Sequence, residues 1–417
     1  MKISIFWVFV LYMCSGIISA HAQQIKMPKQ GKNLTSRQVV EYLASDALEG
    51  RYPGTKGDTL ASLFIKGQFK KLGLESSLQP FGIKKDSCTT FNVIGILKGQ
   101  EEKYIVVGAH YDHLGYGGAN SGSRQPDTVA IHNGADDNAS GIAAMLYLAK
   151  KYSFGEKPKK GIIFVAFGAE EKGVIGSKEF AANPLVERKK IVAMFNFDMV
   201  GYLRGGAISI GGTGTAKELD SLIDKALITY NNPDKLLKQT LAGTPIKLKK
   251  SKEGVGPSDH SAFYAKNIPV AYFSTGATLD YHTPGDDAYK LNYAGIDSVA
   301  NFAGVLLNYI IEQPSLTFTE CGSPNMGPMR ASFKVTLGLM PDVTGQVENG
   351  LRADIVIKGK PAYNAGLKNG DIITSINELT VTDIESYMKC LSTLKAGEIA
   401  KIKVKRGGEE LLFNVQL

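Results

Sequence analysis

Three continuous apolar segments, each followed by ionisable residues, constrain the fold of this chain more than any other feature. They occupy residues 104–109, 161–167 and 191–197. Strands of this kind are typical of a sheet that is covered on both faces. Helical patterns follow over residues 142–151, 217–230 and 293–311. The alternation predicts a three-layer α/β domain, with a mostly parallel central sheet and helices on both faces.

The segment before these strands predicts further local elements. Residues 91–98 and 103–109, joined by turn residues 99–102, predict an antiparallel hairpin. Upstream, Ser36 is placed to cap a helix over residues 38–48, and Asp58 to cap one over residues 59–72.

Ionisable side chains stand where the three apolar strands end. His110 and Asp198 follow directly on two of them, and Glu170 and Glu171 come shortly after residue 167. In open α/β sheets, ligands bind at the carboxyl ends of the strands. We therefore expect these four side chains to meet at one edge of the sheet.

Two adjacent carboxylates, Asp136 and Asp137, lie in a turn of small residues that spans residues 134–141. One use for such a turn is to cap a helix, because Asp, Asn and Ser side chains accept hydrogen bonds from free backbone N–H groups. The other use is to hold or bridge a cation. The turn alone favours capping, but its neighbours favour a metal role for Asp137, with Asn138 or Ser140 as the cap.

The candidate metal ligands are two imidazoles and three carboxylates: His110, Asp137, Glu171, Asp198 and His282. Because the set contains no cysteine, it suits borderline divalent metals, zinc first. Two zinc ions would leave one net positive charge against three carboxylates, which lowers the pKa of a shared water. Glu170 remains as the natural general base.

Five motifs resemble the signatures of the co-catalytic di-zinc aminopeptidase family, which includes glutamate carboxypeptidases and glutaminyl cyclases. They are His-Tyr-Asp at 110–112, the turn at 134–141, Ala-Glu-Glu at 169–171, the segment 196–201 and Tyr-His-Thr at 281–283. All five stand in the family's order, and the resemblance covers about residues 34–312. Arg51 with Gly54 and Thr55 also looks like the family's N-terminal loop.

The resemblance implies how the ligands divide between two zinc ions. Asp137 would bridge both ions. His110 and Asp198 would complete one zinc site, and Glu171 and His282 would complete the other.

The resemblance also implies roles around the metals. Glu170 would take a proton from the bridging water and pass it to the leaving amine. Asp112 would orient a ligand histidine, and Tyr281 would donate a hydrogen bond to the tetrahedral intermediate. Asp136 would not bind metal and would instead help to hold the shape of the turn.

Several other polar residues near these motifs are open to a structural interpretation. The segment Asp259-His260-Ser261 is expected to support the cleft or a loop. His113 and His132 are interpreted as ordinary loop histidines.

These features predict a zinc-dependent aminopeptidase that removes N-terminal residues from peptides. A glutaminyl-cyclase-like acyltransferase with one zinc, a carboxypeptidase and a non-catalytic binding protein on the same fold are the alternatives. A carboxypeptidase would need a cation for the terminal carboxylate of its substrate, for which Arg51 and Arg204 are candidates.

The first 22 residues predict a cleavable signal peptide. Lys2 precedes an apolar run over residues 3–18, and Ala20 and Ala22 give the small-x-small cleavage pattern. We therefore expect a secreted or periplasmic protein without stable membrane insertion, with an uncleaved anchor as the alternative.

The net charge of +8 includes no run of five like charges, which argues against nucleic-acid binding. Cys88, Cys321 and Cys390 match no cysteine zinc pattern.

The composition changes after the predicted peptidase domain, residues 23–312. Residues 313–329 predict a linker, and residues 330–417 resemble a PDZ domain of the bacterial protease type. Residues 337–339 match the loop that offers N–H groups to a peptide C-terminus, and residues 384–394 match the helix beside the peptide groove. Glu378 stands where such domains usually have glycine. The alternative is a module that only packs on the catalytic domain.

Overall fold

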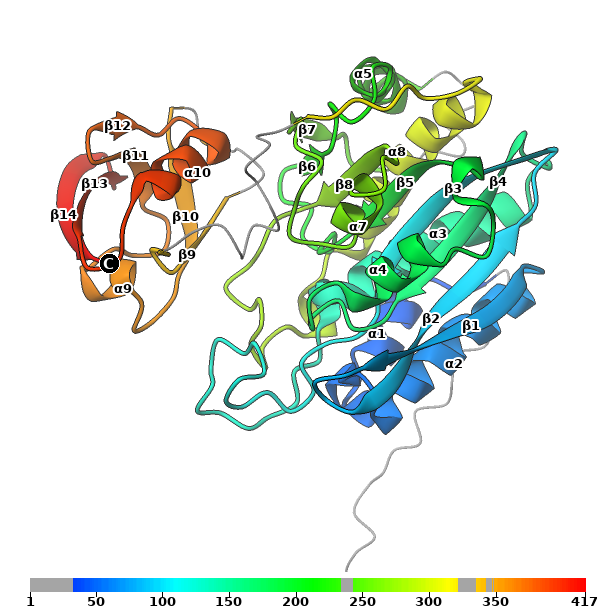
Figure 1. Cartoon of the computed structure of the whole chain (residues 1–417), viewed down its shortest axis with the longest axis horizontal. Coiled ribbons are helices and arrows are strands. Elements are labelled where there is room, and N and C mark those ends of the chain that lie inside the picture. The colour runs from blue at the N-terminus through cyan, green and yellow to red at the C-terminus, as the bar shows by residue number, and fades with distance from the viewer. Residues whose placement is uncertain (1–32, 234–242, 322–334, 343–346, 348) are drawn as a thin grey trace, which may run out of the picture.

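The structure, a computed structural model, describes residues 33–233, 243–321, 335–342, 347 and 349–417. The expected signal peptide, residues 1–22, and the second part of the expected linker, residues 322–329, lie outside the described residues. The described residues form two sheets, of eight and six strands, each with its own hydrophobic core (Figure 1). The larger sheet carries the candidate site.

The larger sheet has the strand order β1-β2-β4-β3-β5-β8-β6-β7. Its strands are β1 (Glu75–Ile83), β2 (Cys88–Leu97), β3 (Glu101–His110), β4 (Lys160–Phe167), β5 (Ile191–Phe197), β6 (Ala207–Gly211), β7 (Lys247–Lys250) and β8 (Val270–Ser274). The central strands β4, β3, β5 and β8 pair in parallel. Antiparallel pairs occur to either side, where β1 meets β2, β2 meets β4, and β8 meets β6. The α/β fold class is thus confirmed, with a sheet that is parallel at its centre and mixed as a whole.

The expected hairpin of β2 and β3 is wrong, because β4 lies between these two strands. β2 pairs antiparallel with β4, and β3 pairs parallel with β4. The short connection between β2 and β3 therefore crosses the start of β4. Gly99 makes this crossing possible, since a Cβ at this residue would lie 2.3 Å from the backbone nitrogen of Gly161. Local turn signals could not reveal that a distant strand enters between the two.

Helices cover both faces of the larger sheet, as the three-layer expectation requires (Figure 1). Ile105 and Val107 of β3 belong to the core beneath α1 (Ser36–Leu43), α2 (Lys56–Lys71), α3 (Gly141–Ser153), α5 (Leu219–Asn231) and α8 (Tyr293–Glu312). Val106, between them, faces the core beneath α4 (Ile175–Ala182) and α7 (His260–Tyr264). Short helical turns at Asp46–Arg51, Ala135–Ser140, Arg188–Lys190 and Ala288–Lys290 complete this part.

The helix starts differ in detail from the expected ones. Thr35, rather than Ser36, caps α1 through its side chain, and α1 ends at Leu43. Thr55 caps α2 by accepting a bond from the backbone N–H of Asp58.

Within the described residues, α8 is the helix with the length and composition to cross a membrane, yet 78% of its most apolar window is buried in the domain. Burial of this extent is typical of a core helix.

The smaller sheet has the order β14-β13-β11-β10-β9, with β12 paired to β11. Its elements are β9 (Leu339–Pro341), β10 (Leu351–Val356), α9 (Pro361–Asn364), β11 (Ile372–Ile376), β12 (Leu379–Thr380), α10 (Ile384–Thr393), β13 (Ile399–Arg406) and β14 (Glu409–Gln416). β9 follows the loop at residues 337–338 and forms an edge of the sheet. Glu378 adopts a φ of 69°, the left-handed conformation that glycine reaches without strain.

Candidate metal centre

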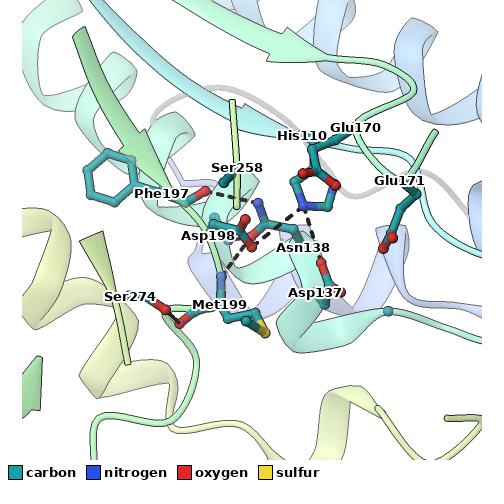
Figure 2. Close-up of polar contacts among 12 residues, drawn as sticks. His110, Asp137, Asn138, Glu170, Glu171, Phe197, Asp198, Met199, Ser258 and Ser274 are labelled. Carbon is teal, nitrogen blue, oxygen red and sulfur yellow. Dashed lines mark hydrogen bonds and ion pairs between the residues drawn. The ribbon is translucent and has the colours of Figure 1, made fainter. Parts of the chain in front are cut away.

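Three neighbouring parallel strands deliver side chains to one edge of the larger sheet. His110 is the last residue of β3 and stands level with Phe167, the last residue of β4. Glu170 and Glu171 follow β4, and Asp198 follows β5. Figure 2 shows these side chains converging on the space around Asp137. The grouping expected at the carboxyl edge is therefore present.

The carboxylate of Asp137 lies between two histidines. Its Oδ1 is 3.2 Å from Nε2 of His110, and its Oδ2 is 3.1 Å from Nε2 of His282. Asp198 Oδ1 lies 3.5 Å from the same nitrogen of His110, and Glu171 Oε1 lies 3.1 Å from that of His282. All five predicted ligands thus lie in two adjoining groups that share Asp137.

The chemistry of these groups fits divalent cations. Nδ1 of His282 lies 3.0 Å from the carbonyl oxygen of Gly122, to which it can donate. The Nε2 atom then carries a lone pair, which points at the carboxylate oxygens of Asp137 and Glu171. Lone pairs and carboxylates that face one another need a positive charge between them. Two imidazole nitrogens with three carboxylates are a donor set that suits zinc.

The pKa values of His110, His282 and Asp137 are shifted because the carboxylates and the imidazoles lie close together. Although burial disfavours the imidazolium, the carboxylates of Asp198 and Asp137 raise the pKa of His110 well above its ordinary value. Glu171 likewise raises the pKa of His282 against the effect of burial. Conversely, the two histidines hold the pKa of the buried Asp137 well below its usual range. The metal-free centre therefore attracts cations, including protons.

Glu170 sits beside the ligands, and its backbone is held by Asp112. The Asp112 carboxylate accepts the N–H of Glu170 at 2.9 Å and that of Glu171 at 3.2 Å. Its Oδ1 is 3.7 Å from Nδ1 of His110, whose nearer contact is the Asp112 carbonyl at 3.3 Å. Burial, reinforced by the nearby carboxylates of Glu171 and Asp259, raises the pKa of Glu170 well above its usual value. A carboxylate in such surroundings has an increased tendency to take up a proton.

The turn that carries Asp137 is fastened by a carboxylate to which the sequence assigned no role. Asp286 accepts the backbone N–H groups of Asp136 at 2.9 Å and of Asp137 at 3.0 Å. Asp136 points the other way and accepts the N–H of Gly201 at 2.7 Å. Asn138 accepts the N–H of Gly141, the first residue of α3, at 2.9 Å, whereas Ser140 at the N-cap makes no side-chain capping bond. Asp286 stands four residues after His282, and only this proximity signalled its involvement.

Three non-glycine residues at the centre have left-handed backbones. Ala169 precedes Glu170 with φ 56°, Met199 follows Asp198 with φ 53°, and His282 itself has φ 54°. Such conformations cost free energy and persist where the surrounding structure enforces them, often at functional sites. Tyr281 stacks its ring on that of His282, with centroids 3.8 Å apart and planes 16° apart.

Arg51 is fully buried and forms hydrogen bonds to backbone carbonyls. Its guanidinium donates to the carbonyls of Leu43, Tyr111, Asn133 and Gly134. Burial lowers the pKa of Arg51 to about 10, so it remains charged at neutral pH. The suggestion that Arg51 anchors a substrate carboxylate is therefore wrong, because its donors are used inside the protein. Arg204 is exposed, with Nη2 3.5 Å from the carbonyls of Thr275 and Ala277.

The remaining histidines differ from one another. His132 contacts Ser123 Oγ at 2.8 Å and the Ala130 carbonyl at 2.9 Å, as a loop histidine would. His113, in contrast, lies 3.0 Å from Glu171 Oε1, and with Asp137 and Glu171 it forms a group that could hold a metal. Its interpretation as an ordinary loop histidine is wrong. Its position three residues after His110 was the available signal.

Asp259 and His260 lie at the start of α7 and are buried. Burial raises the pKa of Asp259 to about 7 and lowers that of His260 to about 3. The His260 ring stacks on Tyr272 with centroids 4.4 Å apart. Both residues therefore lie in the packed interior beside the centre.

Comparison with known proteins agrees with this geometry. The Peptidase family M28 model matches residues 92–307, and a PDZ domain model matches residues 340–417. Leupeptin-inactivating enzyme 1 of Streptomyces exfoliatus is 29% identical over 306 residues, which cover 70% of this chain and 62% of that enzyme. This chain thus spans less than two thirds of the length of that relative.

Two solved structures share the fold. A glutaminyl cyclase of Porphyromonas gingivalis superposes with a TM-score of 0.54 and 19% identity, covering 66% of this chain and 97% of that one. A leucine aminopeptidase precursor of Bacteroides thetaiotaomicron gives the same TM-score and identity, covering 68% and 98%. At this level of identity both structures show the fold alone. The family match, however, extends over more than half of the sequence, and the chain belongs to peptidase family M28, with a PDZ domain following the peptidase domain.

Proposed function

We propose that this protein is a secreted or periplasmic aminopeptidase that holds two zinc ions and hydrolyses N-terminal residues from peptides. The observation that carries the proposal is the position of Asp137, whose two carboxylate oxygens face His110 and His282 at 3.2 and 3.1 Å. A single carboxylate between two imidazoles could serve as a ligand to both of two adjacent metals. Asp198 and Glu171 would complete the two sites.

When bound, the zinc ions would supply Lewis acidity, which lowers the pKa of water and polarises a carbonyl. Residues of the chain would accept and donate the proton that moves during the reaction. Glu170 adjoins the ligand Glu171, and its pKa is raised by burial and by nearby carboxylates. It would accept the proton of the attacking water and return it to the departing amine, as a general base and then a general acid.

The Tyr281 hydroxyl is the candidate donor to the oxygen that gains charge during attack. Burial, together with the nearby carboxylates, raises the pKa of Tyr281 well above its ordinary value. The phenol therefore keeps its proton at neutral pH and remains a donor. Its stacking on His282 fixes the ring next to the proposed second metal. Donors aimed at developing charge are a major source of rate enhancement.

We further propose that the domain boundaries lie near residues 23–312 and 330–417, with the first 22 residues as a signal peptide. The PDZ domain would bind the C-terminus of a peptide by strand addition at β9. This peptide binding would take place away from the metal centre and would recruit or select substrates.

A substrate panel tests the catalytic proposal. Aminoacyl and N-blocked peptides are assayed with and without a chelator, and bound zinc is counted by elemental analysis. We expect cleavage of free N-termini only, loss of activity with chelator, and two zinc ions per chain. Cleavage of blocked peptides from the C-terminal end would contradict the aminopeptidase assignment. One zinc ion with cyclisation of N-terminal glutamine would instead indicate glutaminyl-cyclase-like chemistry.

Glu170→Gln tests the general base separately. The amide keeps the size of the side chain but accepts no proton at neutral pH. We expect zinc content as in the wild type and a loss of turnover of about 10²–10⁴-fold. Glu187→Gln, at a solvent-exposed residue, is the matched control. Near-normal hydrolysis by Glu170→Gln would exclude Glu170 from the mechanism.

A further inference from the structure

His113 is a buried histidine next to the centre that the proposed ligand set does not use. Its side chain is fully buried, and its Nδ1 lies 3.0 Å from Oε1 of Glu171 and 3.9 Å from Oδ2 of Asp137. The same Oε1 lies 3.1 Å from His282 Nε2. One carboxylate oxygen of Glu171 is therefore contacted by two histidines.

The ring of His113 is held in place by packing. Its centroid lies 5.6 Å from that of His282, edge to face at 73°. On another side it rests on Gly134, where an added Cβ would come within 2.5 Å of the ring. The backbone N–H of His113 donates to the Arg51 carbonyl at 3.3 Å. Movement of the ring away from Glu171 would require these neighbours to shift.

The second ring nitrogen indicates which tautomer is present. Nε2 of His113 is buried and has no hydrogen-bond partner among the described residues. A metal bound to Nδ1 would require the proton to be on Nε2, where it would be an orphaned buried donor. A proton on Nδ1 instead gives Glu171 a hydrogen bond and leaves only an unfilled acceptor at Nε2. Orphaned buried donors are the rarer of the two.

We propose that His113 is a positioning residue, whose Nδ1–H holds the carboxylate of Glu171 in the orientation that the second metal site needs. The inference depends on the proposed function, since it assumes a metal between Glu171 and His282. Partners of ligating carboxylates commonly change metal affinity by 10–100-fold when they are removed. His113 should therefore set the affinity of one of the two sites and leave the other unchanged.

Stepwise zinc titration of metal-free protein, in competition with a chromophoric chelator, tests this proposal. We expect His113→Phe, which keeps the ring but removes the donor, to weaken one of two zinc-binding constants by 10–100-fold. His113→Asn should recover most of the loss, because its amide N–H₂ lies near the place of Nδ1. His132→Phe, which replaces another buried histidine of the same loop, is the matched control and should change neither constant.

A double-variant comparison assigns the affected site. In a His282→Ala background the second site is already disrupted, so adding His113→Phe should weaken the remaining zinc by less than twofold. In a His110→Ala background the full effect should persist. Equal weakening of both constants by His113→Phe, or no weakening of either, would overturn the proposal. A zinc-loaded crystal structure with the metal bonded to Nδ1 of His113 would also overturn it. If the wild type binds fewer than two zinc ions, the proposed function fails instead.

Discussion

The side-chain amide of Asn138 donates a 2.9 Å hydrogen bond to the backbone carbonyl of Phe197 (Figure 2). This bond joins the residue after Asp137 to the residue before Asp198, so it fixes the separation of two proposed ligands on different elements. Oδ1 of Asn138 also accepts the N–H groups of Gly141 and Met199, at 2.9 and 3.3 Å. One buried amide thus ties the turn to the end of β5.

Asn138→Ala should therefore lower both stability and metal affinity. It leaves the Phe197 carbonyl and the Gly141 N–H without their partner, and unsatisfied buried groups cost about 1–3 kcal/mol each. We expect the free energy of unfolding to fall by about 2–4 kcal/mol in urea titrations. The zinc site of His110 and Asp198 should weaken more than the other. Unchanged stability would show that water or a backbone shift replaces the amide.

Asp137→Asn and Asp136→Asn should separate the two adjacent carboxylates. Asp137 faces both histidines, so its neutral amide should leave less than one zinc per chain in elemental analysis. Asp136 accepts the Gly201 N–H through Oδ1, and an amide oxygen can do the same. Asp136→Asn should therefore keep its metals and lose stability only slightly. Loss of both metals in Asp136→Asn would contradict this division of roles.

Arg51→Met should destabilise the peptidase domain severely. The variant leaves four carbonyls without their charged donor, including those of Asn133 and Gly134 just before the Asp137 turn. At about 1 kcal/mol or more for each lost bond, we expect a loss of about 3–5 kcal/mol in the free energy of unfolding. Arg37→Met removes an exposed ion pair with Glu41 and a cation–π contact with Tyr293. Each contributes about 1 kcal/mol or less at an exposed site, so stability should change much less than in Arg51→Met. A fully stable Arg51→Met that lost only substrate binding would contradict the structural role.

Asp58 should make stability fall as pH rises from about 4 to about 6. Burial raises the pKa of this carboxyl to about 6, although Gly54 and Thr90 donate hydrogen bonds to it. The folded state then keeps a proton that the unfolded chain loses near pH 4, and each pH unit in this window costs about 1.4 kcal/mol. Below pH 4 the contribution is fully present, and above pH 6 it is lost.

Comparison with Asp58→Asn isolates this contribution. The difference in unfolding free energy between wild type and variant should change by about 3 kcal/mol across the window and stay flat outside it. Denaturant titrations at several pH values on metal-free protein give the difference directly. A difference that does not vary with pH would mean that Asp58 is ionised in the folded protein.

The larger features of this protein could be predicted from its sequence because they depend on local patterns. Continuous apolar strands identify β3, β4 and β5, and parallel pairing brings their ends, with His110, Glu171 and Asp198, to one edge. The hairpin prediction failed because pairing partners are chosen globally. Only the folded sheet shows that β4 enters between β2 and β3.

The supporting residues of the centre were harder to predict for a similar reason. Asp286 and His113 act through contacts with residues far away in the sequence, and their closeness in sequence to His282 and His110 was the only local signal of a role. Arg51 suggested a substrate anchor because arginines near a site often bind carboxylates. Its burial, which the sequence does not encode locally, reverses that interpretation.

The dispersal of the proposed ligands, from His110 to His282, has a consequence for how the protein matures. In the unfolded chain the five proposed ligands are far apart, because they come from segments that meet only after β3, β4 and β5 have paired. The complete set of five ligands therefore exists only in the folded state, and metal ions that bind it stabilise that state. The centre stays incomplete until the segment that carries His282 has joined the folded sheet, so metal loading is among the last steps in the maturation of the domain.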